Sequence, residues 1–168
     1  MRRRQPLPRL WLMTDERQGE ALWAALDRLP RGAGIVFRHY GLEERQRRAL
    51  FERLRPEARR RGLVLVTAGR GLPRADGVHN RRGPGLRTAS AHNLREIRRA
   101  ERRGAEILFL SPVFATRSHP GAGLLGPRRF ARLARLTRLP VVALGGMDAA
   151  RFDALRGAYG WAGIDAFA

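Results

Sequence analysis

Short apolar runs alternate along this chain with segments that carry the spacing of an amphipathic helix. Eight such runs occupy residues 10–13, 34–37, 63–66, 77–79, 88–91, 107–114, 141–144 and 161–167. Helical spacing occupies residues 18–28, 42–61, 93–103, 126–137 and 148–158. Runs that are apolar throughout are typical of strands buried on both faces, as in a parallel sheet. The alternation therefore predicts an α/β fold.

The number of runs favours a closed barrel over other α/β folds. The chain has 168 residues, whereas (β/α)8 barrels usually need about 200 or more. Residues 70–74 and 81–86 are short and rich in glycine and proline, so we expect no crossover helix there. We predict a compact (β/α)8 TIM-type barrel, with some crossover helices shortened or missing, that spans residues 1–168 as one domain. A smaller open α/β sheet is the alternative.

The formal charge is +19, and all 34 basic residues are arginine. Most of them fall on the helical segments among glutamates, which is typical of solvated helix faces. Such a charge attracts phosphate backbones, but the few aromatic residues do not alternate with arginine as they would in a stacking platform. We therefore expect only nonspecific binding of nucleic acid.

No apolar run approaches the roughly 20 residues that span a bilayer. The basic amino terminus is not followed by the apolar segment of a signal peptide, and the chain has no cysteine. A cytoplasmic protein with no disulfide or thiolate chemistry and no contact with a membrane is expected.

Each of the four histidines, His39, His79, His92 and His119, follows an apolar run. The carboxyl ends of the strands in a parallel barrel meet at one rim, where active sites lie. A single histidine at a strand end would most simply be structural. Four of them predict a functional site at this rim.

Glycine and hydroxyl residues follow three of the strands. Gly145 and Gly146 in "VVALGGMDAA" join a strand to a helix, where backbone N–H groups bind anions, although a tight turn also requires glycine. The stretch "SPVFATRSHPGAG" adds hydroxyls and an imidazole that suit phosphate binding or proton transfer, or that simply form a polar loop. The candidate site residues are Arg38 after the second strand, Ser90 and His92 at the end of the fifth, and Thr116, Ser118 and His119 after the sixth.

Asp15 and Asp76 are the acidic residues nearest to strand ends. Neither has a second acidic neighbour at the spacing of a metal site, and Asp76 is placed to bond backbone groups in a turn. The residues by themselves indicate no metal ligands.

In order, these motifs resemble the thiamine phosphate synthase superfamily, which includes the thiazole tautomerases. The matching segments are Thr14-Asp15, Arg38, Asp76-Gly77-Val78-His79, Ser90-Ala91-His92, Pro112-Val113-Phe114-Ala115-Thr116 and Gly145-Gly146. The resemblance covers roughly residues 8 to 166 and implies a (β/α)8 barrel. It implies a transferase of thiamine biosynthesis, which couples hydroxymethylpyrimidine pyrophosphate to thiazole phosphate and releases pyrophosphate.

The resemblance also implies roles for particular residues. Arg38, Ser90 and Thr116 would contact pyrophosphate, and Gly145 and Gly146 would hold the thiazole phosphate. It implies Mg²⁺, but the ligands are not identified. The third strand ends in Val66-Thr67-Ala68-Gly69 where the synthases have Asn-Asp, and Asn80-Arg81-Arg82-Gly83 stands where they have a second metal carboxylate.

Two alternatives follow from these departures. The first is a thiazole tautomerase that needs no metal and uses His119 or His92 as acid and base. The second is a barrel that only binds a phosphorylated thiazole or pyrimidine, or RNA, without catalysis. Because a barrel without a last helix exposes apolar surface, we also expect self-association into a homo-oligomer.

Overall fold

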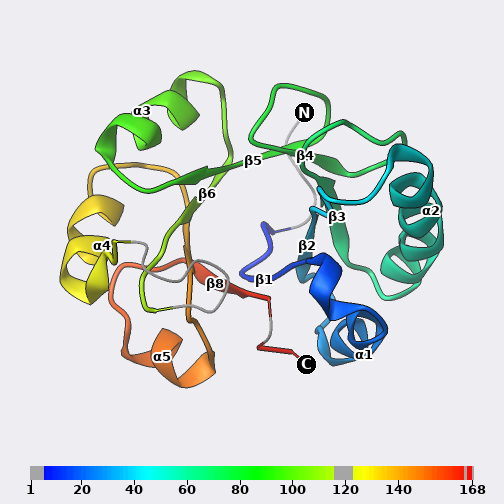
Figure 1. Cartoon of the computed structure of the whole chain (residues 1–168). Coiled ribbons are helices and arrows are strands. Elements are labelled where there is room, and N and C mark those ends of the chain that lie inside the picture. The colour runs from blue at the N-terminus through cyan, green and yellow to red at the C-terminus, as the bar shows by residue number, and fades with distance from the viewer. Residues whose placement is uncertain (1–5, 116–122, 165, 168) are drawn as a thin grey trace.

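Eight parallel strands pair in chain order, and the last pairs with the first, so that the sheet closes into a barrel (Figure 1). This computed structural model describes residues 6–115, 123–164 and 166–167. The predicted (β/α)8 fold is confirmed. The strands are β1 (Leu10–Met13), β2 (Gly34–Phe37), β3 (Val64–Thr67), β4 (Gly77–His79), β5 (Leu86–Ala91), β6 (Ile107–Leu110), β7 (Val141–Leu144) and β8 (Gly160–Gly163).

Helices pack on the outside of the barrel, but in the described part of the chain no helix follows β3 or β4. They are α1 (Ala21–Arg28), α2 (Glu44–Arg60), α3 (Leu94–Arg102), α4 (Gly126–Ala134) and α5 (Ala149–Ala154), with a short 3-10 helix, η1 (Glu16–Gln18), before α1. Residues 68–76 and 80–85, all of which the structure describes, contain no helix. The prediction that crossover helices are missing is therefore confirmed, and it explains how 168 residues close a barrel.

The helix boundaries follow from their capping residues. Asn93 and Asp148 are the N-caps of α3 and α5, and their side chains accept hydrogen bonds from the backbone N–H groups of Glu96 and Arg151. Gly62 and Gly104 follow α2 and α3 with positive φ of 66° and 75°. The sixth strand is shorter than the predicted run 107–114, because Pro112 has no N–H to donate to the ladder.

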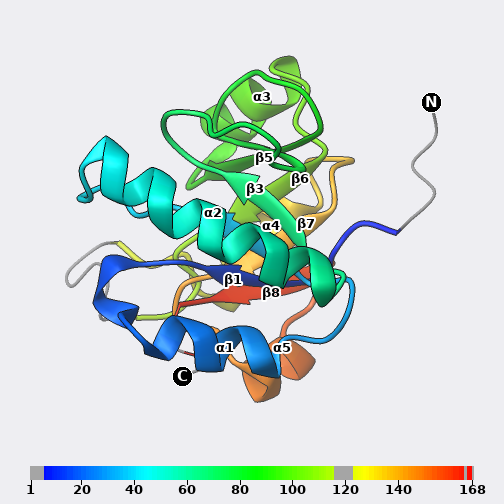
Figure 2. The ribbon, with the colours of Figure 1, turned by 90° about the vertical axis from the view of Figure 1, so that its right-hand side faces the viewer.

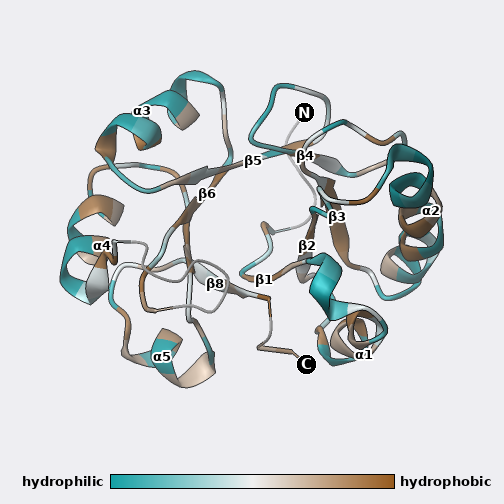
Figure 3. Cartoon of the chain, in the orientation of Figure 1, coloured by the Kyte–Doolittle hydropathy of each residue, from teal (hydrophilic) through white to brown (hydrophobic). Residues whose placement is uncertain are grey.

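Alternate residues of each strand point into the barrel or outward to the helices. The interior is filled by Trp11, Met13, Val36, Val66, Phe109, Val142 and their neighbours. The outward residues pack against the apolar sides of the helices, which Figure 3 shows in brown, while the outer sides are teal. The interior is therefore a packed core, and the ends of the barrel are left for ligands.

The outer face of β8 is partly covered by the residues that follow it. The ring of Phe167 stacks on Trp161 with 5.2 Å between ring centroids, and Arg28 donates to the Phe167 carbonyl at 2.6 Å. These contacts cover part of the apolar outer face of β8, and self-association stays a prediction. Within the described part of the chain, no helix is both long and apolar enough to cross a bilayer.

Candidate functional site

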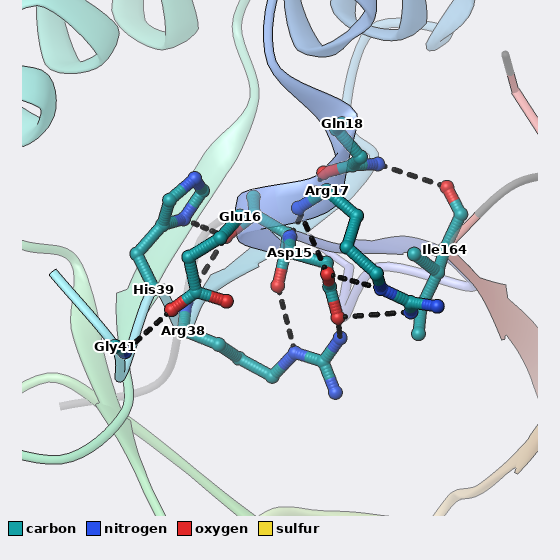
Figure 4. A network of polar contacts seen from close by, with 9 residues as sticks. Asp15, Glu16, Arg17, Gln18, Arg38, His39, Gly41 and Ile164 are labelled. Carbon is teal, nitrogen blue, oxygen red and sulfur yellow. Dashed lines mark hydrogen bonds and ion pairs between the residues drawn. The ribbon is translucent and has the colours of Figure 1, made fainter. Parts of the chain in front are cut away.

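Arg38 lies at the carboxyl end of β2, two residues after the inward-pointing Val36. Its Nε donates to the Thr14 carbonyl at 2.8 Å, and its Nη2 lies 3.3 Å from an Asp15 carboxylate oxygen (Figure 4). Burial lowers the pKa of Arg38, and Asp15 opposes that shift. No described residue accepts a hydrogen bond from Nη1. Arg38 is therefore held in place by two of its nitrogens, while the third is available to a ligand.

Asp15 and Gln18 connect the loop after β1 to the segments that follow β2 and β8. The Asp15 carboxylate caps η1 and accepts from the Arg17 side chain at 2.7 Å, and this hydrogen bond lowers the pKa of Asp15. Gln18, which completes the capping box, donates to the Ile164 carbonyl after β8 at 2.9 Å. The ends of β1, β2 and β8 are thus tied together around Arg38 (Figure 4).

His79 is buried at the end of β4 and connects two hydroxyls of β5. Its Nδ1 lies 2.9 Å from Thr88 Oγ1, and its Nε2 lies 3.0 Å from Ser90 Oγ. Burial lowers the pKa of His79 to about 3, and the charge of Arg38 adds to the shift. The imidazole is therefore neutral at pH 7 and acts as a positioning residue for Ser90 rather than as an acid.

Ser90 is fixed by its backbone as well. Its N–H donates to the Asn80 side-chain carbonyl at 2.7 Å, and Asn80 N–H donates to the Thr88 carbonyl at 2.9 Å. Asn80 has a positive φ of 58°, a conformation that asparagine tolerates better than most residues. The short connection from β4 to β5 therefore holds the Ser90 hydroxyl at the barrel end.

The buried neutral His79 gives a pH-dependent stability. The unfolded chain binds a proton at this histidine below about pH 6.5, whereas the folded chain does not until about pH 3. Stability is therefore unaffected above pH 6.5 and falls below it by up to about 1.4 kcal/mol per pH unit. We expect chemical denaturation between pH 7 and 5 to show this dependence, and His79→Gln to reduce it; His39, whose pKa burial also lowers, contributes the rest. His92→Gln, at an exposed position, should keep the wild-type slope; equal slopes in His79→Gln and wild type would contradict the assignment.

His92 is the exposed histidine among the three that the structure describes. Its Nδ1 lies 2.8 Å from the Ser111 carbonyl oxygen, which can only accept, so Nδ1 carries the proton. The other nitrogen, Nε2, is left to accept a proton or a hydrogen bond. His92 is thus the described residue best suited to acid–base chemistry.

The expectation that the histidines gather around a ligand is wrong for His39. Its side chain is buried in the outer layer, stacked on Phe37 at 4.9 Å, with Nδ1 2.9 Å from Thr14 Oγ1. Phe37 belongs to the apolar layer between the strands and the helices, so the His39 ring that stacks on it lies on the outer side of β2. His39 is structural. Thr116, Ser118 and His119 lie outside the described residues.

Gly145 and Gly146 form the predicted turn between β7 and α5, with φ of 96° and 59°. A Cβ on Gly145 would lie 2.8 Å from Pro112 Cα, and the Gly145 carbonyl accepts from Phe114 N–H at 3.0 Å. Glycine is therefore required for packing. No described residue accepts a hydrogen bond from the N–H of Gly145 or Gly146. The turn can therefore also present both groups to an anion.

The described residues contain no group of three histidine, aspartate, glutamate or cysteine side chains that could hold a metal ion. Asp15 is occupied by Arg17 and Arg38. Asp76 accepts from Leu65 N–H at 2.8 Å, at the opposite end of the barrel from Ser90. These donors do not fit a Mg²⁺ ion with several carboxylate ligands.

Reasoning from the sequence misses three residues that position the site: Asp15, Asn80 and Arg47, whose Nε donates to the Arg38 carbonyl at 3.1 Å. The sequence presents Asp15 as part of a family motif without a role, Asn80 only as a departure from the family, and Arg47 as one arginine among many. An asparagine directly after a strand is a signal for a positive φ. The pairing of Asp15 with Arg38 has no comparable signal, because the two are far apart in the sequence.

Comparison with known proteins gives a consistent result. A family model described as thiamine monophosphate synthase matches residues 78–167. The putative thiamine-phosphate synthase 2 of Aquifex aeolicus is 32% identical over 182 residues, covering 96% of this chain and 98% of that protein. The thiamine-phosphate synthase of Thermus thermophilus is 34% identical, covering 88% and 82%. The solved structure of thiamine phosphate pyrophosphorylase from Pyrococcus furiosus superposes with a TM-score of 0.78 and 25% identity, covering 93% of this chain and 85% of that one.

Proposed function

Since the chain belongs to the thiamine monophosphate synthase family, we propose that it joins hydroxymethylpyrimidine pyrophosphate to thiazole phosphate at the carboxyl end of its barrel. In this reaction the bond between the pyrimidine methylene carbon and the pyrophosphate oxygen breaks, and pyrophosphate leaves with the electron pair. The thiazole nitrogen then donates its lone pair to the methylene carbon. The products are thiamine phosphate and pyrophosphate, and we place the reaction in the cytoplasm.

The observation that carries this proposal is the pair Arg38 and Ser90. Both side chains are held by buried or partly buried partners at the same end of the barrel, and Arg38 is near enough to depress the pKa of His79. A guanidinium with a free N–H and a hydroxyl suit a departing pyrophosphate, whose negative charge grows as the bond breaks. The free N–H groups of Gly145 and Gly146 would bind the phosphate of the thiazole.

Mg²⁺ would neutralise part of the pyrophosphate charge in the family reaction. The described carboxylates do not fit such an ion, so no step is assigned to it here. Arginine would supply positive charge in its place, from Arg38 and from the loop after β4, which contains Arg81 and Arg82; Arg70 after β3 is paired with Glu44 at 2.8 Å.

A tautomerase is the second candidate, because His92 offers an exposed Nε2 with the opposite nitrogen fixed by the Ser111 carbonyl. That reaction moves a proton and has no pyrophosphate to release. The two candidates differ in one requirement, namely binding of the pyrimidine pyrophosphate. Calorimetric titration with each substrate separates them: a synthase binds both, whereas a tautomerase binds the thiazole phosphate alone.

Ser90→Ala should weaken binding of the pyrimidine pyrophosphate about tenfold, as expected for one hydrogen bond to a charged group. The fold should persist, because the bond from Ser90 N–H to Asn80 is made by the backbone. Thr137→Val removes a hydroxyl that bonds Glu101, away from the barrel end, and serves as the control. Equal affinities in the two variants would remove Ser90 from the site.

A further inference from the structure

A cavity of about 920 Å³ opens at the amino-terminal end of the barrel, opposite the candidate site. Its walls come from the residues before β1, β2, β3, β4 and β8, from the start of β3 and from the second half of α2. Figure 2 shows the segment before β1 at the end of the barrel that lies away from the loop between β1 and α1. The proposed reaction makes no use of this cavity.

Arginines converge on the cavity from four separate parts of the chain. They are Arg9, Arg31, Arg55, Arg59 and Arg74. Among the described residues that line it, Asp76 is the acidic one, and its carboxylate already accepts from Leu65 N–H. The cavity wall therefore carries a clear excess of positive charge.

Most of this charge is not compensated by the protein. Within the described chain, the side chains of Arg31, Arg59 and Arg74 make no ion pair or hydrogen bond. Arg55 binds Glu52 at 3.1 Å, but its buried Nε has no partner among the described residues. By contrast, Arg60 and Arg61, next in sequence at the end of α2, pair with Glu57 and Asp27. Unpaired arginines occur elsewhere on the surface too, but here several of them face one concave wall.

The chemistry of the walls indicates the class of ligand. A guanidinium group can donate two parallel hydrogen bonds to the oxygens of one phosphate, and a concave wall of positive charge strengthens the electrostatic attraction of an anion. The volume lies in the range of small-molecule sites, roughly 300–1,000 Å³. Tyr159 is the aromatic residue among those that line the cavity; Arg9 already lies over one face of its ring at 5.4 Å, and its hydroxyl donates to the Leu7 carbonyl at 2.7 Å. The geometry points to a second anion site here, for a compact small molecule that carries two or more linked phosphates.

This site is independent of the proposed function and is tested with inorganic triphosphate as the probe. Calorimetric titration of the full chain is compared with the triple variant Arg31→Gln, Arg59→Gln, Arg74→Gln. The control triple variant Arg102→Gln, Arg132→Gln, Arg135→Gln removes the same charge from positions outside the cavity. Because neither triple variant alters the candidate site, a difference between them reports on the cavity.

We expect the cavity variant to bind triphosphate about thirtyfold more weakly than wild type, and the control to change less than about threefold. Thermal denaturation should show triphosphate stabilising the wild type and the control more than the cavity variant. Equal losses in the two triple variants would overturn the proposal, because net charge would then explain binding. Tight binding of a single-stranded RNA that is lost in the cavity variant, without binding of triphosphate, would also overturn it and assign the surface to nucleic acid.

Discussion

Gly145→Ala should lower the free energy of unfolding by about 3 kcal/mol, combining backbone strain with a steric clash. The position has a φ of 96°, which an L-residue rarely adopts, and the new Cβ would lie 2.8 Å from Pro112 Cα and 3.2 Å from Val113 N. These are backbone neighbours, which cannot rotate away as a side chain can. The melting temperature should fall by roughly 10 °C for a chain of this size.

The matched control is Gly123→Ala, where a Cβ meets nothing within 4 Å and φ is not in the left-handed region. Its melting temperature should stay within about 2 °C of wild type. The folded fraction of Gly145→Ala should also bind thiazole phosphate at least about tenfold more weakly, since the turn that presents the two N–H groups is displaced. Unchanged stability and affinity would contradict the geometry of the turn.

Arg47→Leu should cost about 3 kcal/mol, because a buried cation with several acceptors is removed and the acceptors are left unpaired. Arg47 is 7% exposed, and its guanidinium donates to the carbonyls of Arg38, Ala68 and Arg70 at 3.1, 2.6 and 2.9 Å. It also lies 5.1 Å from the centroid of the Phe37 ring. The residue thereby fastens α2 to the segments that follow β2 and β3, next to the Arg38 backbone.

Arg48→Leu on the same helix is the control. Arg48 is exposed and has a single ion pair among the described residues, with Glu44 at 3.8 Å, so its loss should change stability by no more than about 0.5 kcal/mol. The stability of Arg47→Lys should lie between those of Arg47→Leu and Arg48→Leu, since one ammonium group cannot reach three carbonyls. Urea denaturation measures all three variants. Equal stabilities of Arg47→Leu and Arg48→Leu would show that the carbonyl contacts contribute nothing.

The barrel can be predicted from the sequence because the apolar runs, the stretches without helix and the capping residues all indicate the same fold. Eight apolar runs become eight strands, and the two stretches that are too rich in glycine and proline for helices contain none. The turn at Gly145 and Gly146 and the caps at Asn93 and Asp148 are local features, so the sequence predicts them well. The predicted end of the sixth strand is wrong because hydrophobicity continues to Phe114 after pairing stops at Leu110.

The site is less predictable because it depends on contacts between distant residues. Arg47 is one of 34 arginines, and its sequence neighbours do not mark it as buried. The pairing of Asp15 with Arg38 and the contact of His79 with Ser90 require the closed sheet. The prediction for His39 is wrong for a simpler reason: a position after a strand does not say on which side of the sheet the side chain lies, and His39 stacks on the outward Phe37.

The most direct test of the proposed synthase is turnover with both substrates, with and without Mg²⁺, followed as thiamine phosphate by fluorescence after oxidation. We predict product formation from hydroxymethylpyrimidine pyrophosphate and thiazole phosphate, at a rate that Ser90→Ala lowers. Failure to form product in protein that binds thiazole phosphate would contradict the synthase assignment and leave the tautomerase or a binding protein.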